Sequence, residues 1–247
     1  MKKYFELRCT AYIKEDIPFR ESFGLIAKYV SFAMAQHEAL KDLHEKNAFK
    51  YYSFGSFYPP EKQKVYQKGN IYRFTLRTLD ENFANILVEE LHKNINNPHF
   101  LVIEVQKRVQ KQFFISELYS ATPVVVSVEK GLHWTVQSDG DILKLQKQFH
   151  DNLEKKYQNF YGEKLQPLQN FIQLLEIKNQ KPQIIEIVKE GKKIKFFGNK
   201  FRIIPHEDEV SQKLAFTALG AGLGEKNSFG GGFCVAKANK AMQGVLR

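Results

Sequence analysis

This sequence has few of the residues that build disulfide frameworks, metal sites or membrane spans. Only two of its 247 residues are cysteines, Cys9 and Cys234, and they lie far apart and form no Cys-x-x-Cys pair. We therefore expect neither a disulfide framework nor a zinc site. No apolar run approaches the roughly 20 residues that a membrane-spanning helix needs. Polar residues interrupt the basic N-terminus too early for a signal peptide, so we expect a soluble cytoplasmic protein.

Motifs for metal, nucleotide or serine chemistry are absent as well. No two of the seven histidines stand at the i, i+4 spacing of a helical zinc pair, and none has a cluster of cysteines or carboxylates beside it. The sequence contains neither a Walker phosphate-binding motif nor a Gly-x-Ser-x-Gly nucleophile elbow. We therefore expect no metal and no cofactor.

The chain has an excess of positive charge. It contains 37 basic and 27 acidic residues, a net charge of +10. Such a balance favours a polyanionic partner, although a lysine-rich proteome would give the same excess without one. The excess is concentrated in residues 181–202, where basic residues alternate with Ile, Val and Phe. This pattern predicts a hairpin whose lysines, Lys192, Lys193 and Lys195, follow a phosphate backbone, or else a solvated edge that lysines protect from aggregation.

Apolar periodicity predicts the fold class. In the first half, strands and helices follow the order βαββαβ, with strands at 2–13, 49–58, 70–79 and 100–114 and helices at 20–45 and 80–92. The second half reads as a looser version, with strands at 121–128 and 132–137, helices at 140–161 and 207–219, a strand meander over 183–204 and a last strand at 233–236. We therefore predict an α+β protein of two tandem ferredoxin-like (RRM-like) domains with antiparallel sheets, residues 1–116 and 117–247.

A glycine-rich loop is predicted near the C-terminus. Six of the fifteen glycines lie within the thirteen residues 220–232. Glycine has no Cβ, so this density is typical of a loop whose backbone comes close to a ligand, although many such loops are only turns. Lys226, Asn227 and Ser228 stand among the glycines, where their donors can serve a phosphate.

This loop and the segment after the first helix together resemble a known family. Four glycines match the GxGxxxxxGxG loop of the CRISPR-associated repeat-RNA endoribonucleases, the Cas-six family of the RAMP superfamily: Gly222, Gly224, Gly230 and Gly232. Leu43-His44-Glu45 with Phe49-Lys50 resembles the family's LHE…KPFTFS segment, and residues 121–126 resemble the strand that opens its second domain. Gly231 departs from the pattern, because the family usually carries a bulkier residue there.

The resemblance implies a metal-independent nuclease that cleaves precursor crRNA by 2′-hydroxyl attack, leaving a 2′,3′-cyclic phosphate and a 5′-hydroxyl. It also implies an active site in which His44 transfers protons and Lys50 stabilises the phosphorane. Tyr29 is expected to position the RNA or, as a second choice, to act as the base. His37, on the same predicted helix, is the competing histidine. In one straight helix Tyr29 and His44 would stand about 22 Å apart, so the helix must break or bend between them.

The expected partner is CRISPR repeat RNA, bound by the glycine loop with Lys226, Asn227 and Ser228 and by the lysine hairpin. One alternative is a non-catalytic RAMP protein that binds guide RNA beside other CRISPR effector subunits. In that case His44 is only a helix-end residue, which the helix dipole favours. A second alternative is a basic RNA-binding module unrelated to CRISPR. No membrane partner is expected, and the sequence leaves open whether the protein is a monomer or a homodimer.

Overall fold

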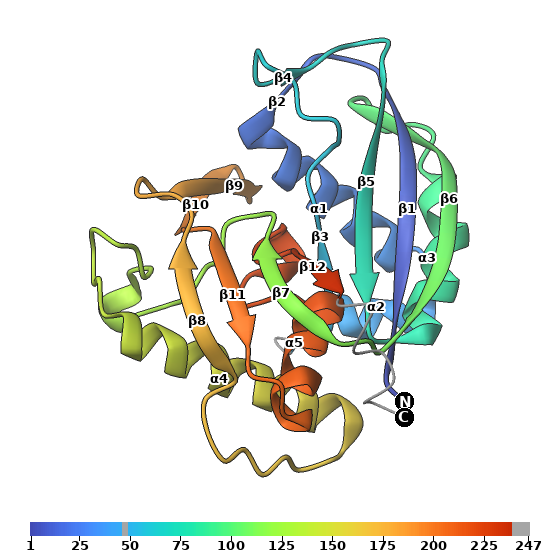
Figure 1. Ribbon diagram of the computed structural model, residues 1–247. Coiled ribbons are helices and arrows are strands. Elements are labelled where there is room, and N and C mark those ends of the chain that lie inside the picture. The colour runs from blue at the N-terminus through green and yellow to red at the C-terminus, as the bar shows by residue number, and fades with distance from the viewer. Residues whose placement is uncertain (46–48, 239–247) are drawn as a thin grey trace.

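The protein is built from two antiparallel four-stranded sheets with helices packed behind them (Figure 1). The computed structural model describes residues 1–45 and 49–238, and only the backbone at residues 42–45 and 130. This arrangement confirms the α+β class and the two antiparallel sheets. None of the helices in these described ranges is long and apolar enough to cross a membrane.

The N-terminal half has the βαββαβ order that the sequence predicts. Its main elements are β1 (Lys3–Ile13), α1 (Phe19–Ala35), α2 (Glu38–Glu45), β3 (Tyr52–Phe54), β5 (Ile71–Thr78), α3 (Glu81–Lys93) and β6 (Phe100–Lys111). The strands form one sheet in the order β3-β5-β1-β6, and a separate two-stranded sheet pairs β2 (Ile17–Pro18) with β4 (Val65–Tyr66). Strand β5 alternates buried and more exposed residues, so one face of the sheet packs under the helices and the other stays open.

The predicted single helix over 20–45 is two helices. Helix α1 ends at Ala35 and α2 begins at Glu38. His37 lies in the break, where its Nδ1 accepts a hydrogen bond from the backbone N–H of Ala39, 3.3 Å away. This bond satisfies a donor of the first turn of α2, as a capping residue does. The competing histidine of the sequence therefore has a structural role at the start of the helix that contains His44.

The C-terminal half repeats the architecture with one insertion. Its elements are β7 (Ile115–Ser120), α4 (Ile142–Tyr161), β8 (Ile172–Ile177), β9 (Gln183–Lys189), β10 (Lys192–Gly198), β11 (Phe201–Pro205), α5 (Glu209–Ala221) and β12 (Cys234–Ala238), with short 3₁₀ turns at η1 (Glu129–Gly131) and η2 (Asn227–Phe229). The main sheet has the order β12-β7-β11-β8, and β9 pairs only with β10. The hairpin is thus inserted between the second and third strands of a second βαββαβ unit.

Two strand predictions in this half, 121–128 and 132–137, were wrong. Residues 121–137 form isolated bridges and turns, and the first strand is β7, just before them. The valines of this segment bond to loops instead of a strand: Val124 N donates to Asn199 O, and Val125 O accepts from Glu225 N. Strand β8 was missed, and the expected meander over 183–204 divides into the β9–β10 hairpin and a central strand of the main sheet, β11.

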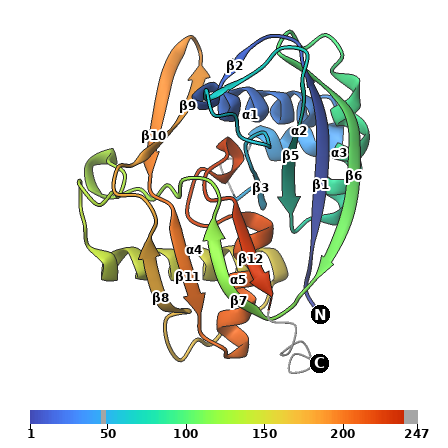
Figure 2. The same ribbon diagram turned by 45° about the horizontal axis from the view of Figure 1, so that its top comes forward.

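The inserted hairpin packs against the other half of the molecule. Ile185, Ile187 and Phe196 belong to the hydrophobic core of the N-terminal half. On α1, a Cβ added at Gly24 would lie 2.8 Å from Glu186 O, so the helix and β9 touch through their backbones. Figure 2 shows the hairpin extending from the second sheet toward the start of α1. The chain crosses between the sheets at residues 112–114, and the predicted domain boundary at 116 stays a prediction.

Candidate catalytic segment and nucleic-acid interface

The glycine-rich segment, residues 220–232, runs from the end of α5 to β12 and is packed into the protein. A Cβ added at Gly222 would lie 2.5 Å from Asn227 Nδ2, and one added at Gly232 would lie 1.9 Å from Leu223 O. Both residues also have positive φ angles, +84° and +64°. These glycines are therefore required for close contacts inside the protein. Whether their backbone also meets RNA stays a prediction.

Lys226, Asn227 and Ser228 have different surroundings. Asn227 Nδ2 donates to Leu223 O and Gly231 O, at 3.1 and 2.9 Å, so this amide holds the segment together. Lys226 has a left-handed backbone, with φ of 57°, and its Nζ lies 5.6 Å from the centre of the Phe196 ring. Lys226 and Ser228 are both partly exposed. Asn227 is partly exposed as well, but its amide is engaged in the bonds that hold the segment.

A buried lysine that the sequence analysis did not identify lies beneath this segment. Lys156, on α4, is 2% exposed. Its Nζ donates hydrogen bonds to Gly222 O, Gly224 O and Asn227 Oδ1, at 2.8, 2.7 and 2.8 Å. Burial lowers its pKa from the ordinary lysine value to about 7, against the opposing effect of Cys234 and Glu225.

The structure brings the segment around Lys50 next to the glycine-rich segment. A Cβ added at Gly222 would lie 2.9 Å from Ser53 Cβ, and one at Gly230 would lie 3.1 Å from the Phe54 ring. Lys50 itself is half-buried just before β3, and burial lowers its pKa. Its ammonium is therefore closer to neutralisation than that of a surface lysine.

The predicted catalytic residue Tyr29 lies elsewhere. Tyr29 is fully buried in α1, where its hydroxyl donates to Leu91 O at 2.8 Å and its ring stacks on Phe100 with centroids 4.6 Å apart. Burial raises its pKa to about 12. Because its side chain is fully buried, we do not expect Tyr29 to contact RNA. His44 belongs to α2, and its side chain lies outside the described residues.

The β9–β10 hairpin presents its lysines to solvent, as the sequence predicts. Lys192, Lys193 and Lys195 are all exposed. Lys193 forms an ion pair with Glu186, with its Nζ 3.2 Å from Glu186 Oε1. Beside the hairpin, His133 lies 5.8 Å from the ring of Phe196, and burial together with Lys226 lowers its pKa. His133 thus contacts the hairpin and lies within the electrostatic influence of Lys226 in the glycine-rich segment, an arrangement that sequence spacing could not reveal.

A cleft of about 580 Å³ separates the open face of the N-terminal sheet from the C-terminal half. Its lining includes basic side chains, Arg8, Arg73, Arg77 and Lys200, and the accessible rings of Phe19 and Tyr58. Buried Glu6 accepts from Arg8 Nε and Arg77 Nε at 2.7 and 2.8 Å. Burial raises the pKa of Glu6, but the two arginines outweigh this and hold it below its usual value. The cleft therefore combines positive charge with rings that can stack on bases.

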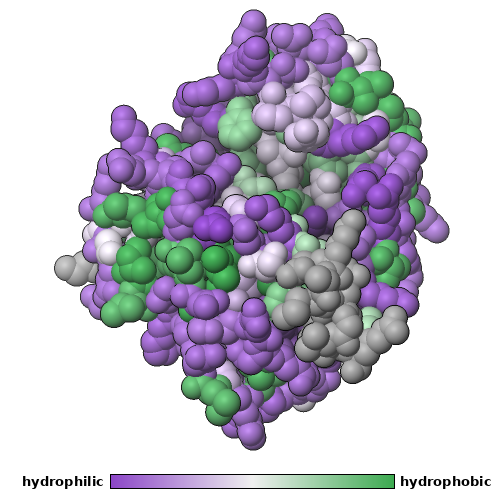
Figure 3. All heavy atoms as spheres, viewed as in Figure 1, coloured by the Kyte–Doolittle hydropathy of each residue, from purple (hydrophilic) through white to green (hydrophobic). Residues whose placement is uncertain are grey.

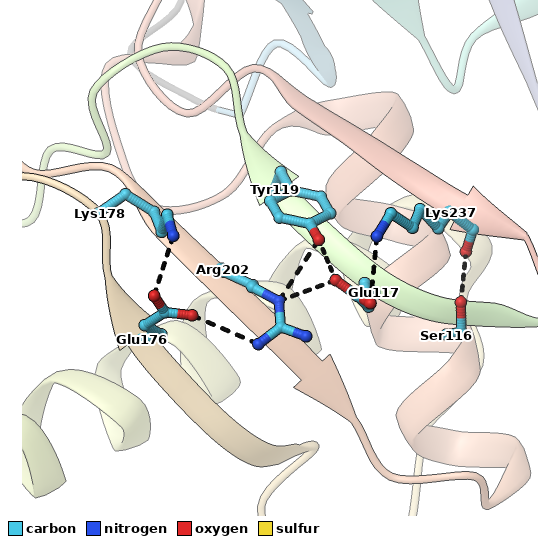
Figure 4. A network of polar contacts seen from close by, with 7 residues as sticks. All are labelled: Ser116, Glu117, Tyr119, Glu176, Lys178, Arg202 and Lys237. Carbon is cyan, nitrogen blue, oxygen red and sulfur yellow. Dashed lines mark hydrogen bonds and ion pairs between the residues drawn. The ribbon is translucent and has the colours of Figure 1, made fainter.

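The open face of the C-terminal sheet carries charges that neutralise one another (Figure 4). Arg202 lies between two carboxylates, with Nε 2.8 Å from Glu117 and Nη1 3.3 Å from Glu176. The hydrogen bonds from Arg202 and Tyr119 lower the pKa of Glu117 to about 2. Arg202 belongs to the basic stretch 181–202, so counting charges along the sequence overstated the free charge there. Figure 3 shows apolar side chains over β8 and β11 on the same face, where Leu174 pairs with Ile204.

No cluster of three potential metal-ligating side chains occurs within residues 1–45 and 49–238, apart from the side chains at 42–45 and 130.

Comparison with known proteins identifies the family. The model of the family "CRISPR associated protein Cas6, C-terminal" matches residues 104–236. No curated protein matches the chain. Among solved structures, the chain is similar to a CRISPR-associated protein Cas6 (TM-score 0.64, 20% identity, 95% of this chain and 99% of that one). It is also similar to a RAMP protein binding different RNA substrates (TM-score 0.67, 16% identity, 94% of this chain and 99% of that one). A third similar structure is a Cas6 product complex (TM-score 0.62, 14% identity, 96% of this chain and 100% of that one).

At these identities the structural likeness shows the fold, which agrees with two ferredoxin-like units over nearly the whole chain. The family match is independent of that likeness and spans more than half of the chain. The chain therefore belongs to the Cas6 family of CRISPR-associated proteins.

Proposed function

We propose that this protein is a metal-independent endoribonuclease that binds CRISPR repeat RNA and cuts precursor crRNA. Membership of the Cas6 family implies a crRNA-processing endoribonuclease. The observation that carries the residue-level proposal is the packing of the Lys50 segment against the glycine-rich segment, through Ser53 and Gly222. Half-buried Lys50 thus belongs to a segment that contacts the one carrying the partly exposed side chains of Lys226 and Ser228.

In the proposed reaction the 2′-hydroxyl oxygen beside the scissile bond attacks its own phosphorus. A new 2′-O–P bond forms as the P–O5′ bond breaks, which gives a 2′,3′-cyclic phosphate and a 5′-hydroxyl. One proton leaves the 2′-oxygen and one is delivered to the 5′-oxygen. The nucleophile belongs to the substrate, so this step requires no activated water.

We assign the proton transfers to His44, because the ordinary pKa of histidine lies near neutral pH. We assign stabilisation of the phosphorane to Lys50, whose ammonium offers a positive charge to the developing anion. Partial burial supports this role, since a charge acts more strongly where water is excluded.

Two exposed basic regions support binding of the rest of the RNA. The hairpin offers Lys192, Lys193 and Lys195, which suit contacts to phosphates. The cleft offers Arg8, Arg73 and Arg77 together with aromatic rings, which suits single-stranded RNA whose bases are unstacked. Other CRISPR effector subunits stay candidate partners.

The test is cleavage of the repeat RNA from the protein's own genome, in EDTA, by wild type, His44→Ala, Lys50→Ala and His92→Ala. His92 is a matched control, because it is exposed and stands near the end of α3 as His44 stands near the end of α2. We expect one cut by wild type and by His92→Ala, ending in a cyclic phosphate. The rate should fall about 10²–10⁴-fold in His44→Ala and about 10²–10³-fold in Lys50→Ala.

Tight binding of repeat RNA without a cut by wild type would instead indicate a guide-RNA-binding subunit. A His44→Ala variant that cleaves at the wild-type rate would remove His44 from the mechanism. His37→Ala would then be the next variant, compared by its effect on helix content as well as on cleavage, because His37 caps α2.

A further inference from the structure

Lys156 occupies a position that is rare for a lysine. It lies on α4 between exposed Lys155 and buried Tyr157, and is itself 2% exposed. Lysine is almost never fully buried unless its charge has partners. Here the three protons of the ammonium meet three oxygens at 2.7–2.8 Å, those of Gly222, Gly224 and Asn227. Its hydrogen-bonding capacity is therefore filled.

These three acceptors lie at different points of the glycine-rich segment, and one of them extends the contact. Asn227 accepts from Lys156 and donates to Leu223 O and Gly231 O. The single ammonium thus connects, directly or through one amide, both ends of the turn that carries Lys226 and Ser228. Removing it would leave two carbonyls and an amide oxygen to find other donors in a buried place.

The same ammonium also faces the predicted catalytic segment. Lys156 Nζ lies 5.9 Å from the centre of the Phe49 ring, and Phe49 directly precedes Lys50. Tyr51, directly after Lys50, packs on Phe160 of the same helix with ring centroids 5.0 Å apart. Helix α4 therefore contacts both neighbours of Lys50 while Lys156 holds the glycine-rich segment.

Stability alone gives a weak reason for a charge at this place. Desolvating an ammonium is costly, and apolar replacements of buried ion pairs are often neutral or stabilising. Burial lowers the pKa of Lys156 to about 7, which reflects that cost. The described groups that oppose the lowering are Glu225, in the glycine-rich segment, and Cys234, at the start of β12.

We propose that Lys156 is a positioning residue, which holds the glycine-rich segment in register with the Lys50 segment so that both meet the scissile phosphate. This inference rests on the proposed function. Lys156 is too buried to contact RNA, so its effect passes through the carbonyls and the amide that it binds. Displacements of about 1 Å in such a site can lower a rate by about 10²-fold.

The test compares Lys156→Met, Lys156→Gln and the control Lys155→Met. Methionine keeps much of the volume without donors, glutamine keeps an amide donor, and Lys155 is the exposed neighbour with the same charge. We would measure the single-turnover cleavage rate at saturating protein, and the Kd for repeat RNA with a 2′-deoxy group at the cut. Hydrogen exchange of residues 222–232 would report the order of the segment.

We expect Lys156→Met to cleave about 10–100-fold more slowly at saturation, with its Kd changed by less than about threefold. Lys156→Gln should fall between Met and wild type, and Lys155→Met should match wild type. Exchange in 222–232 should be fastest in Lys156→Met, intermediate in Lys156→Gln and unchanged in Lys155→Met. A wild-type rate at saturation in Lys156→Met, or a loss confined to Kd, would overturn the inference.

The experiment distinguishes failure of this inference from misfolding of a variant and from failure of the proposed function. If Lys156→Met does not fold, as judged by circular dichroism, the Gln variant decides by the same rate and exchange criteria. If wild type itself does not cleave, the proposed function fails. Hydrogen exchange then decides the inference alone, and unchanged exchange of 222–232 in Lys156→Met would overturn it.

Discussion

The glycine-rich segment and the β9–β10 hairpin were both predicted to bind RNA, but they are built in opposite ways. The segment directs its glycines inward, where an added Cβ would collide with Leu223 O or Asn227. The hairpin directs Lys192, Lys193 and Lys195 outward. The high glycine content of the first segment therefore indicates close packing within the protein. The alternation of lysine with apolar residues in the hairpin indicates an exposed edge. Only the second pattern is direct evidence of a surface that a polyanion can reach.

The largest expected effect comes from testing the two regions with the same substitution. Gly232→Ala should lower the free energy of unfolding by at least about 3 kcal/mol, because its Cβ would lie 1.9 Å from a backbone oxygen at φ +64°. Gly191→Ala, in the hairpin turn, has a similar φ of +74° with nothing within 4 Å, and should cost only about 1–2 kcal/mol. Urea unfolding measures both, and equal losses would contradict the inward packing of the segment.

A smaller effect is expected when charge is removed from the hairpin. Replacing Lys192, Lys193 and Lys195 with alanine should weaken repeat-RNA binding by about 10–100-fold and lower the salt slope by about 2, near 0.7 per lost phosphate contact. Stability should change little, since these side chains are exposed. Titrations at several salt concentrations measure the slope. The control removes three lysines from α4, Lys144, Lys147 and Lys155, and equal effects of the two triplets would show that the hairpin has no special place in binding.

The smallest effect concerns Tyr29, a polar group that faces inward. Tyr29→Phe removes the hydrogen bond to Leu91 O and should cost about 1 kcal/mol of stability, with cleavage unchanged. Thermal unfolding and single-turnover cleavage test the two parts. A folded variant that cleaves more than tenfold more slowly would return Tyr29 to the active site.

Elements whose signals are local were predictable from the sequence. Helices α3, α4 and α5 begin where an aspartate accepts a hydrogen bond from a backbone N–H three residues on: Asp80, Asp141 and Asp208. Helix α4 ends at Gly162, whose φ of 68° closes the last turn. Strand β5 follows from its alternating apolar and polar residues, which become alternately buried and more exposed in the sheet. These features depend on neighbours within a few residues, so pattern reasoning reaches them.

Elements that depend on distant contacts were not predictable. The valines at 124–126 have the pattern of a strand, but their backbone bonds to Asn199, Glu225 and Trp134. At the break before α2, His37 acts as a cap. The sequence contains no helix-breaking residue there from which the break could be predicted.

The sequence contained a signal for the buried position of Lys156, which the sequence-based prediction did not use. Lys156 shares a helical face with the buried residues Phe149, Leu153 and Tyr157, and a lysine on such a face requires partners. The identity of those partners comes only from the tertiary structure.

The inserted hairpin has a consequence for how the molecule holds together. Ile185, Ile187 and Phe196 leave the second half of the chain to complete the core of the first, while Tyr4 and Leu79 of the first half join the core of the second. Each half of the chain thus contributes apolar side chains to the hydrophobic core of the other half. We therefore expect the two sheets to unfold as one cooperative unit. Cutting the chain between them would leave two fragments, each with an incomplete core.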